Sequence, residues 1–341
     1  MDPVQLVTPA GELCEHPDVE GRIEPELCRA MFRAMVLARR FDTEAFALQR
    51  QGELGLWLQC HGQEAAQVGS TTALRSTDYV FPSYREHAAA LVRGITPAQL
   101  LVQWRGNAHS GWDPEAYRFH VYTLVLAAQL LHATGYARGV QLDGAEEVVL
   151  AYFGDGASSE GDTSEAFNFA AVADAPVVFF CQNNQWAIST PTSAQSRTPL
   201  HERARGFGLR TMVVDGNDVL AVHAVTTQLA EHARSGSGPA RCAHTRRGGA
   251  AAGRDGRAAV PRLQRGRHLP GRALRRPRHA RGGRPPHVRH GHAAGRRPEV
   301  QHQPRLDPQR GTAVGRAHHE VLSSLGCSTD QIAEMQDKGV I

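Results

Sequence analysis

The sequence predicts an α/β fold in which a parallel sheet is flanked by helices. Residues 148–153 (VVLAYF) form a continuous apolar run that stops at a glycine-rich turn, as buried parallel strands do. A helix is expected from Ser159 to about Ala173, where Pro176 closes it, and residues 177–181 form a second apolar strand. The face of this helix expected to be apolar carries Ala166, Phe169, Ala170 and Ala173.

Further elements extend the same pattern on both sides. Pro25 is expected at the first position of a helix. A strand is expected from Leu209 to Val214, and a helix capped by Asp218 runs to about Arg234. The residues that recur at helical spacing after Pro25 are Leu27, Met31, Met35, Ala38, Phe41, Ala45 and Leu48.

Polar residues follow the two central strands and suit a divalent cation. Gly154-Asp155-Gly156 ends the first strand and Asn183-Asn184 ends the second, at the edge where α/β folds bind ligands. The Asp155 carboxylate and Asn184 amide oxygen fit a Mg²⁺ bound to a diphosphate. Glycines let the backbone approach such a ligand, and the N-terminus of the next helix favours phosphate. The alternative is an ordinary strand-turn-helix ending in a polar turn.

From about Gly21 to Ala240 the sequence resembles a family, the alpha subunit of the thiamine diphosphate-dependent decarboxylating component of 2-oxo acid dehydrogenase complexes. A single motif would be weak, but several segments occur in the family's order. They are residues 48–53 (LQRQGE), 62–65 (GQEA), 84–87 (YREH), 129–133 (QLLHA), 154–162 (GDGASSEGD), 183–191 (NNQWAISTP) and 214–219 (VDGNDV).

The resemblance implies a thiamine diphosphate-binding fold and a set of site residues. Mg²⁺ would be bound by Asp155, Asn184 and the backbone carbonyl of Trp186. Tyr84 and Arg85 would contact the cofactor phosphates, a role that suits a phenol and a guanidinium. The full cofactor-binding set is Tyr84, Arg85, Leu124, Leu126, Gly154, Asp155, Gly156, Ala157, Asn184 and Trp186.

Several of these positions have simpler interpretations. In the resemblance, Gly156 and Ala157 offer N–H groups to the diphosphate, and Leu124 and Leu126 support the aminopyrimidine ring. Without it, Tyr84-Arg85 would be a solvated turn and the two leucines plain core packing. A potassium site near Gln129, present in some members, is left open because Ala128 lacks the hydroxyl that some of them carry.

The implied activity is oxidative decarboxylation of a 2-oxo acid with transfer of the acyl group to lipoyl. Residues 187–191 favour a branched-chain 2-oxo acid slightly over pyruvate, and acetoin is a further alternative. The implied partners are a beta subunit in an α₂β₂ assembly, which supplies the activating carboxylate, and the lipoyl-bearing acyltransferase of the complex. No catalytic residue is assigned to this chain.

Other reactive side chains have weaker claims. Cys60 and His61 are adjacent, so on a strand they would point to opposite sides and not form a catalytic pair. His87 is a candidate for the pocket wall, and His132 is expected to be a hydrogen-bonded packing residue. The cysteines at 14, 28, 60, 181, 242 and 327 show no zinc spacing, which makes a reducing, cytoplasmic location the default. No signal peptide or membrane span is expected.

The chain changes character after residue 240. Residues 241–320 contain 20 Arg, no Lys, no Phe, Trp or Tyr, and 61 residues that are Arg, His, Gly, Pro or Ala. Their net charge is +16, whereas residues 1–240 carry −10. Such a composition is not expected to bury a core and predicts a disordered basic tract.

Two interpretations of this tract differ in function. A basic arm would bind nucleic acid or another polyanion. An out-of-frame translation of a GC-rich gene is favoured, because the family pattern stops where another core strand should begin. The family's loop histidine, which reaches the cofactor, also lies beyond this point and is not matched, so a wall of the active site is expected to be missing. A third interpretation is therefore a non-catalytic remnant of such a subunit.

The predicted organisation therefore has four parts. They are an N-terminal arm at 1–20, the cofactor-binding domain at 21–240, the low-complexity tract at 241–317, and a short helical tail at 318–341. The tail is similar to the C-terminal end of family III CoA-transferases at residues 321–326, 332–335 and 339–341, but the catalytic body of that family is absent.

Overall fold

The computed structural model describes residues 2–8, 10–19, 24–107 and 110–245, together with Thr329 and Ala333. The chain divides after residue 250, and every strand and helix discussed below lies before that point. Of the expected tail at 318–341, only Thr329 and Ala333 are described, and both are helical.

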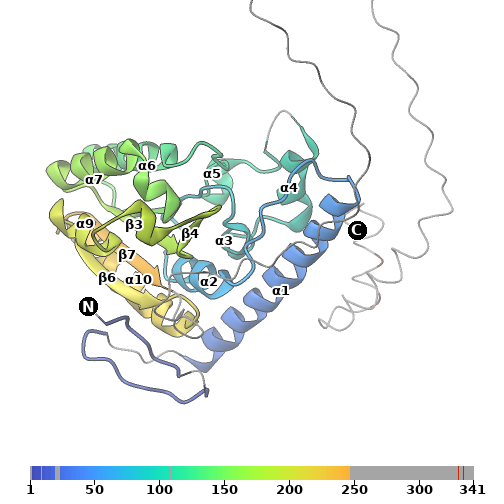
Figure 1. Ribbon diagram of the computed structural model, residues 1–341, viewed down its shortest axis with the longest axis horizontal. Coiled ribbons are helices and arrows are strands. Elements are labelled where there is room, and N and C mark those ends of the chain that lie inside the picture. Colours follow the sequence, from blue (N-terminus) through green and yellow to red (C-terminus); the bar gives the residue numbers. More distant parts are fainter. Residues whose placement is uncertain are drawn as a thin grey trace, which may run out of the picture. The chain divides into compact units, whose positions relative to one another are not determined.

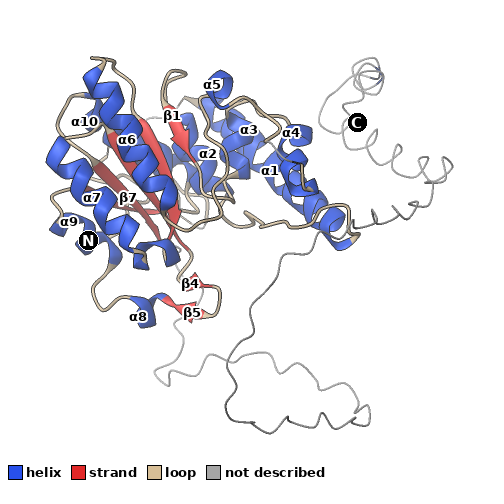
Figure 2. Cartoon of the chain, turned by 90° about the horizontal axis from the view of Figure 1, so that it is seen from above, coloured by secondary structure: helices blue, strands red, loops and turns tan. Residues whose placement is uncertain are grey.

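A parallel sheet of five strands forms the centre of the fold (Figures 1 and 2). The strands lie in the order β1, β2, β3, β7, β6, and every neighbouring pair is parallel. Because all carboxyl ends meet at one edge, the loops that follow β1, β2 and β3 are adjacent in space. The strands are β1 (Tyr79–Phe81), β2 (Val149–Gly154), β3 (Val177–Asn183), β6 (Arg210–Asp215) and β7 (Ala240–Thr245).

Helices cover both faces of this sheet, as Figure 2 shows. One face is covered by α2 (Glu64–Thr72) and α10 (Val219–Arg234), and α1 (Pro25–Arg50) and α3 (His87–Val92) pack on α2. The other face is covered by α6 (Ala128–Leu142), α7 (Gly161–Ala173) and α9 (Leu200–Gly206). The predicted α/β class with a helix-flanked parallel sheet is confirmed.

Shorter elements connect these layers. A two-stranded antiparallel hairpin of β4 (Trp186–Ala187) and β5 (Thr190–Pro191) follows β3. The remaining elements are α4 (Pro97–Val102), η1 (Gln103–Arg105), α5 (Pro114–Tyr117), η2 (Gly156–Ser159) and α8 (Thr192–Gln195).

The central strands pack apolar side chains into both layers. Along β2, Leu150 and Tyr152 belong to the core on the α10 side, while Val149, Ala151 and Phe153 belong to the core on the α6 and α7 side. A strand buried on both faces needs a continuous apolar run, which explains why residues 148–153 predicted it.

Helix α7, which follows β2, begins at a different residue than predicted and buries a partly different set of side chains. A short 3₁₀ turn, η2, precedes α7, which begins at Gly161 instead of Ser159. Ala166 and Ala170 are buried as expected, but Phe169 is 56% exposed and Phe167 is buried instead. The predicted face was wrong only for Phe169, because an alanine-rich helix has two nearly equivalent apolar stripes and tertiary packing selects between them.

Strand β7 corrects the expectation that the fold stops at residue 240. Residues 240–245 form a strand between β3 and β6, and the side chains of Arg241 and His244 are buried. Backbone pairing on both sides forms this strand although its sequence, ARCAHT, lacks the apolar run of a central strand. The first residues of the basic tract therefore belong to the sheet, and the rest of 241–320 lies outside the described residues.

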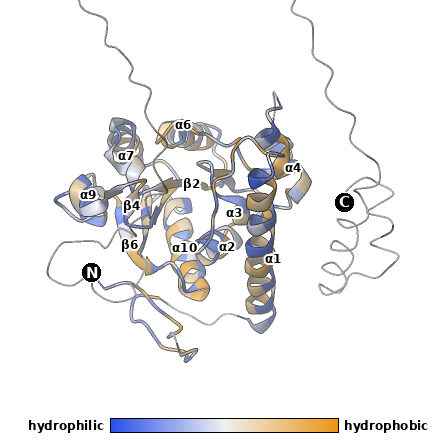
Figure 3. Cartoon of the chain, turned by 45° about the vertical axis from the view of Figure 1, so that its right-hand side comes forward, coloured by the Kyte–Doolittle hydropathy of each residue, from blue (hydrophilic) through white to orange (hydrophobic). Residues whose placement is uncertain are grey.

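The two long outer helices agree with their predictions. Helix α1 begins at Pro25, and apolar and polar residues alternate along it (Figure 3). Its buried residues include Met31, Ala38, Phe41 and Ala45, which face α2 and α3 and not the sheet. Asp218 caps α10 by accepting from the N–H groups of Leu220 and Ala221.

The N-terminal segment, expected as an arm, lies along the edge of the sheet. Val4 pairs with Val214 of β6, and its N–H donates to the carbonyl of Val213 at 2.8 Å. None of the helices in the described residues is both long and apolar enough to span a membrane.

Candidate functional site

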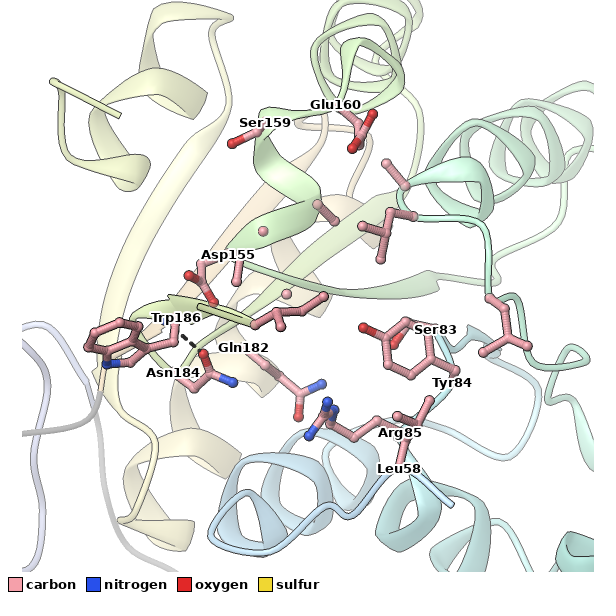
Figure 4. A pocket seen from close by; sticks show the side chains of 18 of the residues that line it. Leu58, Ser83, Tyr84, Arg85, Asp155, Ser159, Glu160, Gln182, Asn184 and Trp186 are labelled. Carbon is pink, nitrogen blue, oxygen red and sulfur yellow. Dashed lines mark hydrogen bonds between the residues drawn. The ribbon is translucent and has the colours of Figure 1, made fainter. Parts of the chain in front are cut away.

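A cavity of about 780 Å³ opens at the carboxyl edge of β1, β2 and β3 (Figure 4). Its walls come from the loops after these strands, from the β4–β5 hairpin and from the segment before α6. The structure brings all ten residues of the predicted cofactor set to this one cavity: Tyr84, Arg85, Leu124, Leu126, Gly154, Asp155, Gly156, Ala157, Asn184 and Trp186.

Asp155 is fixed in the wall by a neighbouring donor. It is 2% exposed, and its Oδ2 accepts a hydrogen bond from Thr192 Oγ1 at 2.8 Å. Burial raises the pKa of Asp155, while the hydrogen bond from Thr192 opposes that rise.

The glycines beside Asp155 have different roles. A Cβ on Gly156 would lie 2.8 Å from the Cβ of Ala187, so the hairpin can pack on this loop only because residue 156 is glycine. A Cβ on Gly154 would meet nothing within 4 Å, which leaves that side open to a ligand. Gly156 and Ala157 begin the η2 turn, so their N–H groups have no acceptor within that turn.

The two asparagines after β3 shape the turn that carries Trp186. Asn183 Oδ1 accepts from the N–H of Gln185, and Asn184 Oδ1 accepts from the N–H of Trp186, both at 2.9 Å. Figure 4 shows the second bond beside Asp155. Gln185 has a φ of +70°, a conformation that costs free energy and is more common at functional sites.

This donor set fits a magnesium ion that is also bound by phosphate. Asp155 and Asn184 both line the cavity, and the Trp186 backbone lies on the same turn as Asn184. Mg²⁺ commonly takes one or two protein carboxylates and completes its shell with phosphate and water oxygens. Within the described residues, no group of three or more His, Cys, Asp and Glu side chains could hold a metal ion. A set of one carboxylate, one amide and one carbonyl does not require such a group.

Tyr84 and Arg85 lie in the turn after β1, and both are half-buried. The Arg85 guanidinium donates to the carbonyl of Gln59 at 2.7 Å and lies 5.7 Å from the centre of the Tyr84 ring. The turn is thus not a freely solvated one, and Figure 4 shows both side chains at the cavity.

Sequence reasoning missed polar residues that support this site. Glu86, Ser83 and Gln182 line the cavity, and the Glu86 carboxylate accepts hydrogen bonds from the other two. Thr192 donates a hydrogen bond to Asp155. Glu86 occurs in the 84–87 segment quoted above, but no spacing pattern joins it to Gln182. Only the parallel pairing of the strands brings these residues together.

The histidine and cysteine candidates lie away from the cavity lining. Cys60 is buried, which raises the pKa of its thiol, and His61 is exposed; they occupy a loop, not the strand expected.

His87 is buried between the carbonyl of Leu58 and the hydroxyl of Tyr122, each at 2.9 Å. His132 is exposed, so its expected packing role was wrong. Gln129 lines the cavity and donates to the carbonyl of Tyr152 at 2.8 Å.

Residues 32–243 match the family model described as dehydrogenase E1 component. A 3-methyl-2-oxobutanoate dehydrogenase subunit alpha of Mycobacterium tuberculosis is 46% identical over 240 residues, which cover 70% of this chain and 65% of that protein. A pyruvate dehydrogenase E1 component subunit alpha of Bacillus cereus is 34% identical, covering 69% of this chain and 64% of that protein. The mitochondrial 2-oxoisovalerate dehydrogenase subunit alpha of Homo sapiens is 36% identical, and the match covers 62% of this chain and 50% of that protein.

The chain thus spans about half to two thirds of the length of these relatives. Among solved structures, a transketolase from Pichia stipitis is similar with a TM-score of 0.50 and 17% identity, covering 63% of this chain and 36% of that one. At this identity the similarity concerns the fold alone.

Proposed function

The chain belongs to the dehydrogenase E1 component family, and from this membership we propose that it derives from the alpha subunit of a thiamine diphosphate-dependent 2-oxo acid dehydrogenase. The proposed reaction is oxidative decarboxylation of a branched-chain 2-oxo acid or pyruvate, with transfer of the acyl group to lipoyl. The relatives include subunits named for both kinds of substrate.

One observation carries the proposal. The loops after three adjacent parallel strands bring Tyr84 and Arg85, Asp155, and Asn184 to a single cavity of about 780 Å³. A carboxylate and an amide that would bind a cation therefore share this cavity with a guanidinium and a phenol that suit phosphate oxygens. The cavity volume is within the range of cofactor sites.

Within this site each residue has a proposed task. Asp155, Asn184 and the Trp186 carbonyl would hold Mg²⁺, and Arg85 and Tyr84 would bind the diphosphate, helped by the free N–H groups of Gly156 and Ala157. Leu124 and Leu126 would contact the aminopyrimidine ring. When bound, thiamine diphosphate supplies the nucleophilic carbon and the electron sink for loss of CO₂ from a 2-oxo acid.

A partner subunit is proposed to complete the cavity. Apolar side chains are exposed around its mouth: Leu124, Leu126, Trp186 and Ile188, the last with 103% relative exposure. Ile188 also has a φ of +55°, which is strained for a β-branched residue. A rim of this kind favours burial against another chain, and we propose a beta subunit in an α₂β₂ assembly that then acts on the lipoyl-bearing acyltransferase.

The cofactor assignment has a direct test. Asp155→Ala and Asn184→Ala should each abolish magnesium-dependent thiamine diphosphate binding by the full chain together with a beta subunit, because each removes a predicted metal ligand. Fluorescence of Trp186, which lines the cavity, can report binding. Asp143→Ala, an exposed carboxylate at the end of α6, is the matched control and should bind normally. Equal binding by wild type and Asp155→Ala would disprove the assignment.

We also propose a location for the protein and a boundary for its cofactor-binding domain. A cytoplasmic location agrees with the free thiols of Cys14, Cys60, Cys181 and Cys242 among the described residues. The cofactor-binding domain is proposed to extend through β7 to residue 245. Polyanion binding by the basic tract, the alternative from the sequence, gains nothing from the comparisons.

A further inference from the structure

A fully buried carboxylate in the cavity wall has no task in the proposed cofactor site. Glu86 directly follows the predicted phosphate-binding pair, Tyr84 and Arg85, and is 0% exposed. Isolated carboxylates are rarely buried, because removing their charge from water costs several kcal/mol unless donors compensate. The identity of those donors therefore indicates what Glu86 does.

The donors come from two different cavity walls. From the loop after β1, the N–H of Ser83 donates at 2.7 Å, its hydroxyl at 2.9 Å, and the N–H of Arg85 at 3.3 Å. From the end of β3, the Gln182 side-chain amide donates to the other carboxylate oxygen at 2.6 Å. Glu86 thus joins the turn that carries Arg85 to strand β3, in which Gln182 lies two residues before Asn184.

A second buried glutamine closes this network into a ring. Gln67 of α2 donates to Gln182 Oε1 at 3.0 Å and to the carbonyl of Arg85 at 3.1 Å, and it accepts from the N–H of Ala88 at 3.1 Å. Gln67 and Gln182 are both buried. Each end of the Arg85 backbone is therefore held by the ring, while its guanidinium is held by Gln59.

We propose that Glu86 is a positioning residue that fixes the spacing between the Tyr84–Arg85 pair and Asn184, and so between the diphosphate and metal sides of the cofactor site. The inference rests on the proposed function of that site. Glu86 does not contact the cofactor in this role. Both of its oxygens are used by protein donors, so it is not arranged for proton transfer.

The charge of Glu86 is what the role requires. An ionised carboxylate only accepts hydrogen bonds, so it can serve all of its donors at once. Glutamine has the same size but turns one acceptor into an NH₂ group, which would face either Gln182 Nε2 or the N–H of Ser83. Glu86→Gln should therefore release one wall of the cavity from the other while the core remains packed.

The test uses the full chain with a beta subunit and titrates thiamine diphosphate in the presence of Mg²⁺. Glu86→Gln should weaken binding about 10–100-fold, the usual cost of losing a group that supports a direct ligand. Hydrogen exchange should also become faster at residues 83–88, and this readout needs no cofactor. Wild type is measured first, because failure of wild type to bind would reject the proposed function and with it this inference.

A matched control separates positioning from general stability. Thr134→Val removes buried hydrogen bonds from the Thr134 hydroxyl to the carbonyls of Leu130 and Ala166, outside the cavity lining and the ring. It should lower the thermal midpoint but leave the affinity within about twofold and exchange at 83–88 unchanged. The proposal is overturned if wild type binds and Glu86→Gln binds equally well, or if both variants lose affinity to the same extent.

Discussion

His87 illustrates how burial sets the chemistry of a single residue. It is fully buried at the start of α3, and this burial lowers the pKa of His87 to about 3. Because a carbonyl can only accept, its Nε2–H donates to Leu58 and its Nδ1 accepts from Tyr122. The neutral ring therefore supports the Leu58 segment of the cavity wall without exchanging protons there.

A pH dependence of stability follows from this residue. The unfolded chain binds a proton near pH 6.5 that folded His87 rejects until about pH 3, so His87 destabilises the fold as pH falls through this window. Between pH 6.5 and 5 the loss should be about 2 kcal/mol. His87→Gln keeps a donor and an acceptor but cannot ionise. The free energy of unfolding, measured in urea, should therefore fall less steeply between pH 6.5 and 5 in this variant than in wild type. His61→Gln, at an exposed position, should leave the slope unchanged; a slope equal in wild type and His87→Gln would contradict the argument.

At the scale of elements, Asp218 connects a helix to the N-terminal segment. One carboxylate oxygen caps α10 through the N–H groups of Leu220 and Ala221, each at 3.0 Å. The other accepts from the N–H groups of Leu6 and Val7, each at 2.7 Å. A single buried side chain therefore caps the N-terminus of α10 and binds the N-terminal segment that lies beside β6.

Loss of this carboxylate should be costly. Asp218→Ala should reduce the free energy of unfolding by about 3 kcal/mol, since it removes a helix cap and leaves buried N–H groups without an acceptor. Asp113→Ala removes the cap of the short exposed helix α5 and should cost only about 1 kcal/mol. Urea unfolding measures both losses. We also expect faster proteolysis of the segment before residue 8 in Asp218→Ala but not in Asp113→Ala. Equal losses of unfolding free energy in the two variants would refute this account.

Elements with strong local signals were predictable from the sequence, while features fixed by tertiary contacts were not. The apolar runs of β2 and β3, the cap of α10 and Pro25 of α1 each carry their own signal. The burial of Phe167 over Phe169 depends on which stripe of α7 meets the sheet. Strand β7 has no apolar run and is specified by pairing with β3 and β6.

The candidate site also has residues that the sequence predicted and residues that only the folded structure reveals. The ten predicted residues occur in recognisable segments, and all of them line the cavity; their binding roles stay predictions. Glu86, Gln182 and Thr192 were missed because they act through neighbours that are distant in sequence. The hydrogen bond between Gln182 and Glu86, for example, joins residues 96 positions apart.

At the scale of the whole molecule, the end of the family match and the change in net charge both fall within one strand, β7. The match ends at residue 243, and the net charge changes from −10 before residue 241 to +16 in residues 241–320. Strand β7 spans this point. The composition of the tract favours an out-of-frame translation, and β7 offers a physical check of that hypothesis.

Arg241 is the residue that β7 accommodates least well. It is 1% exposed beside the rings of Phe153 and Phe167, and its Nε has no hydrogen-bond partner among the described residues. Its guanidinium donates to the carbonyl of Leu200. A buried charge without a carboxylate partner costs several kcal/mol, whereas an apolar side chain would fill the same position at the centre of the sheet at no such cost.

The reading-frame hypothesis therefore makes a prediction that the gene can test. DNA sequencing across the codons for residues 230–345, translated in all three frames, should reveal a frame that places apolar residues at 241–243 and continues into a loop containing a histidine. The chain would then be a misread or damaged copy of an enzyme subunit whose cofactor wall is encoded in the other frame. If no frame restores an apolar strand, the arginine-rich tract is genuine. The cost of burying Arg241 would then be a real property of the fold, and salt-dependent retention on DNA would become the decisive measurement for residues 246–320.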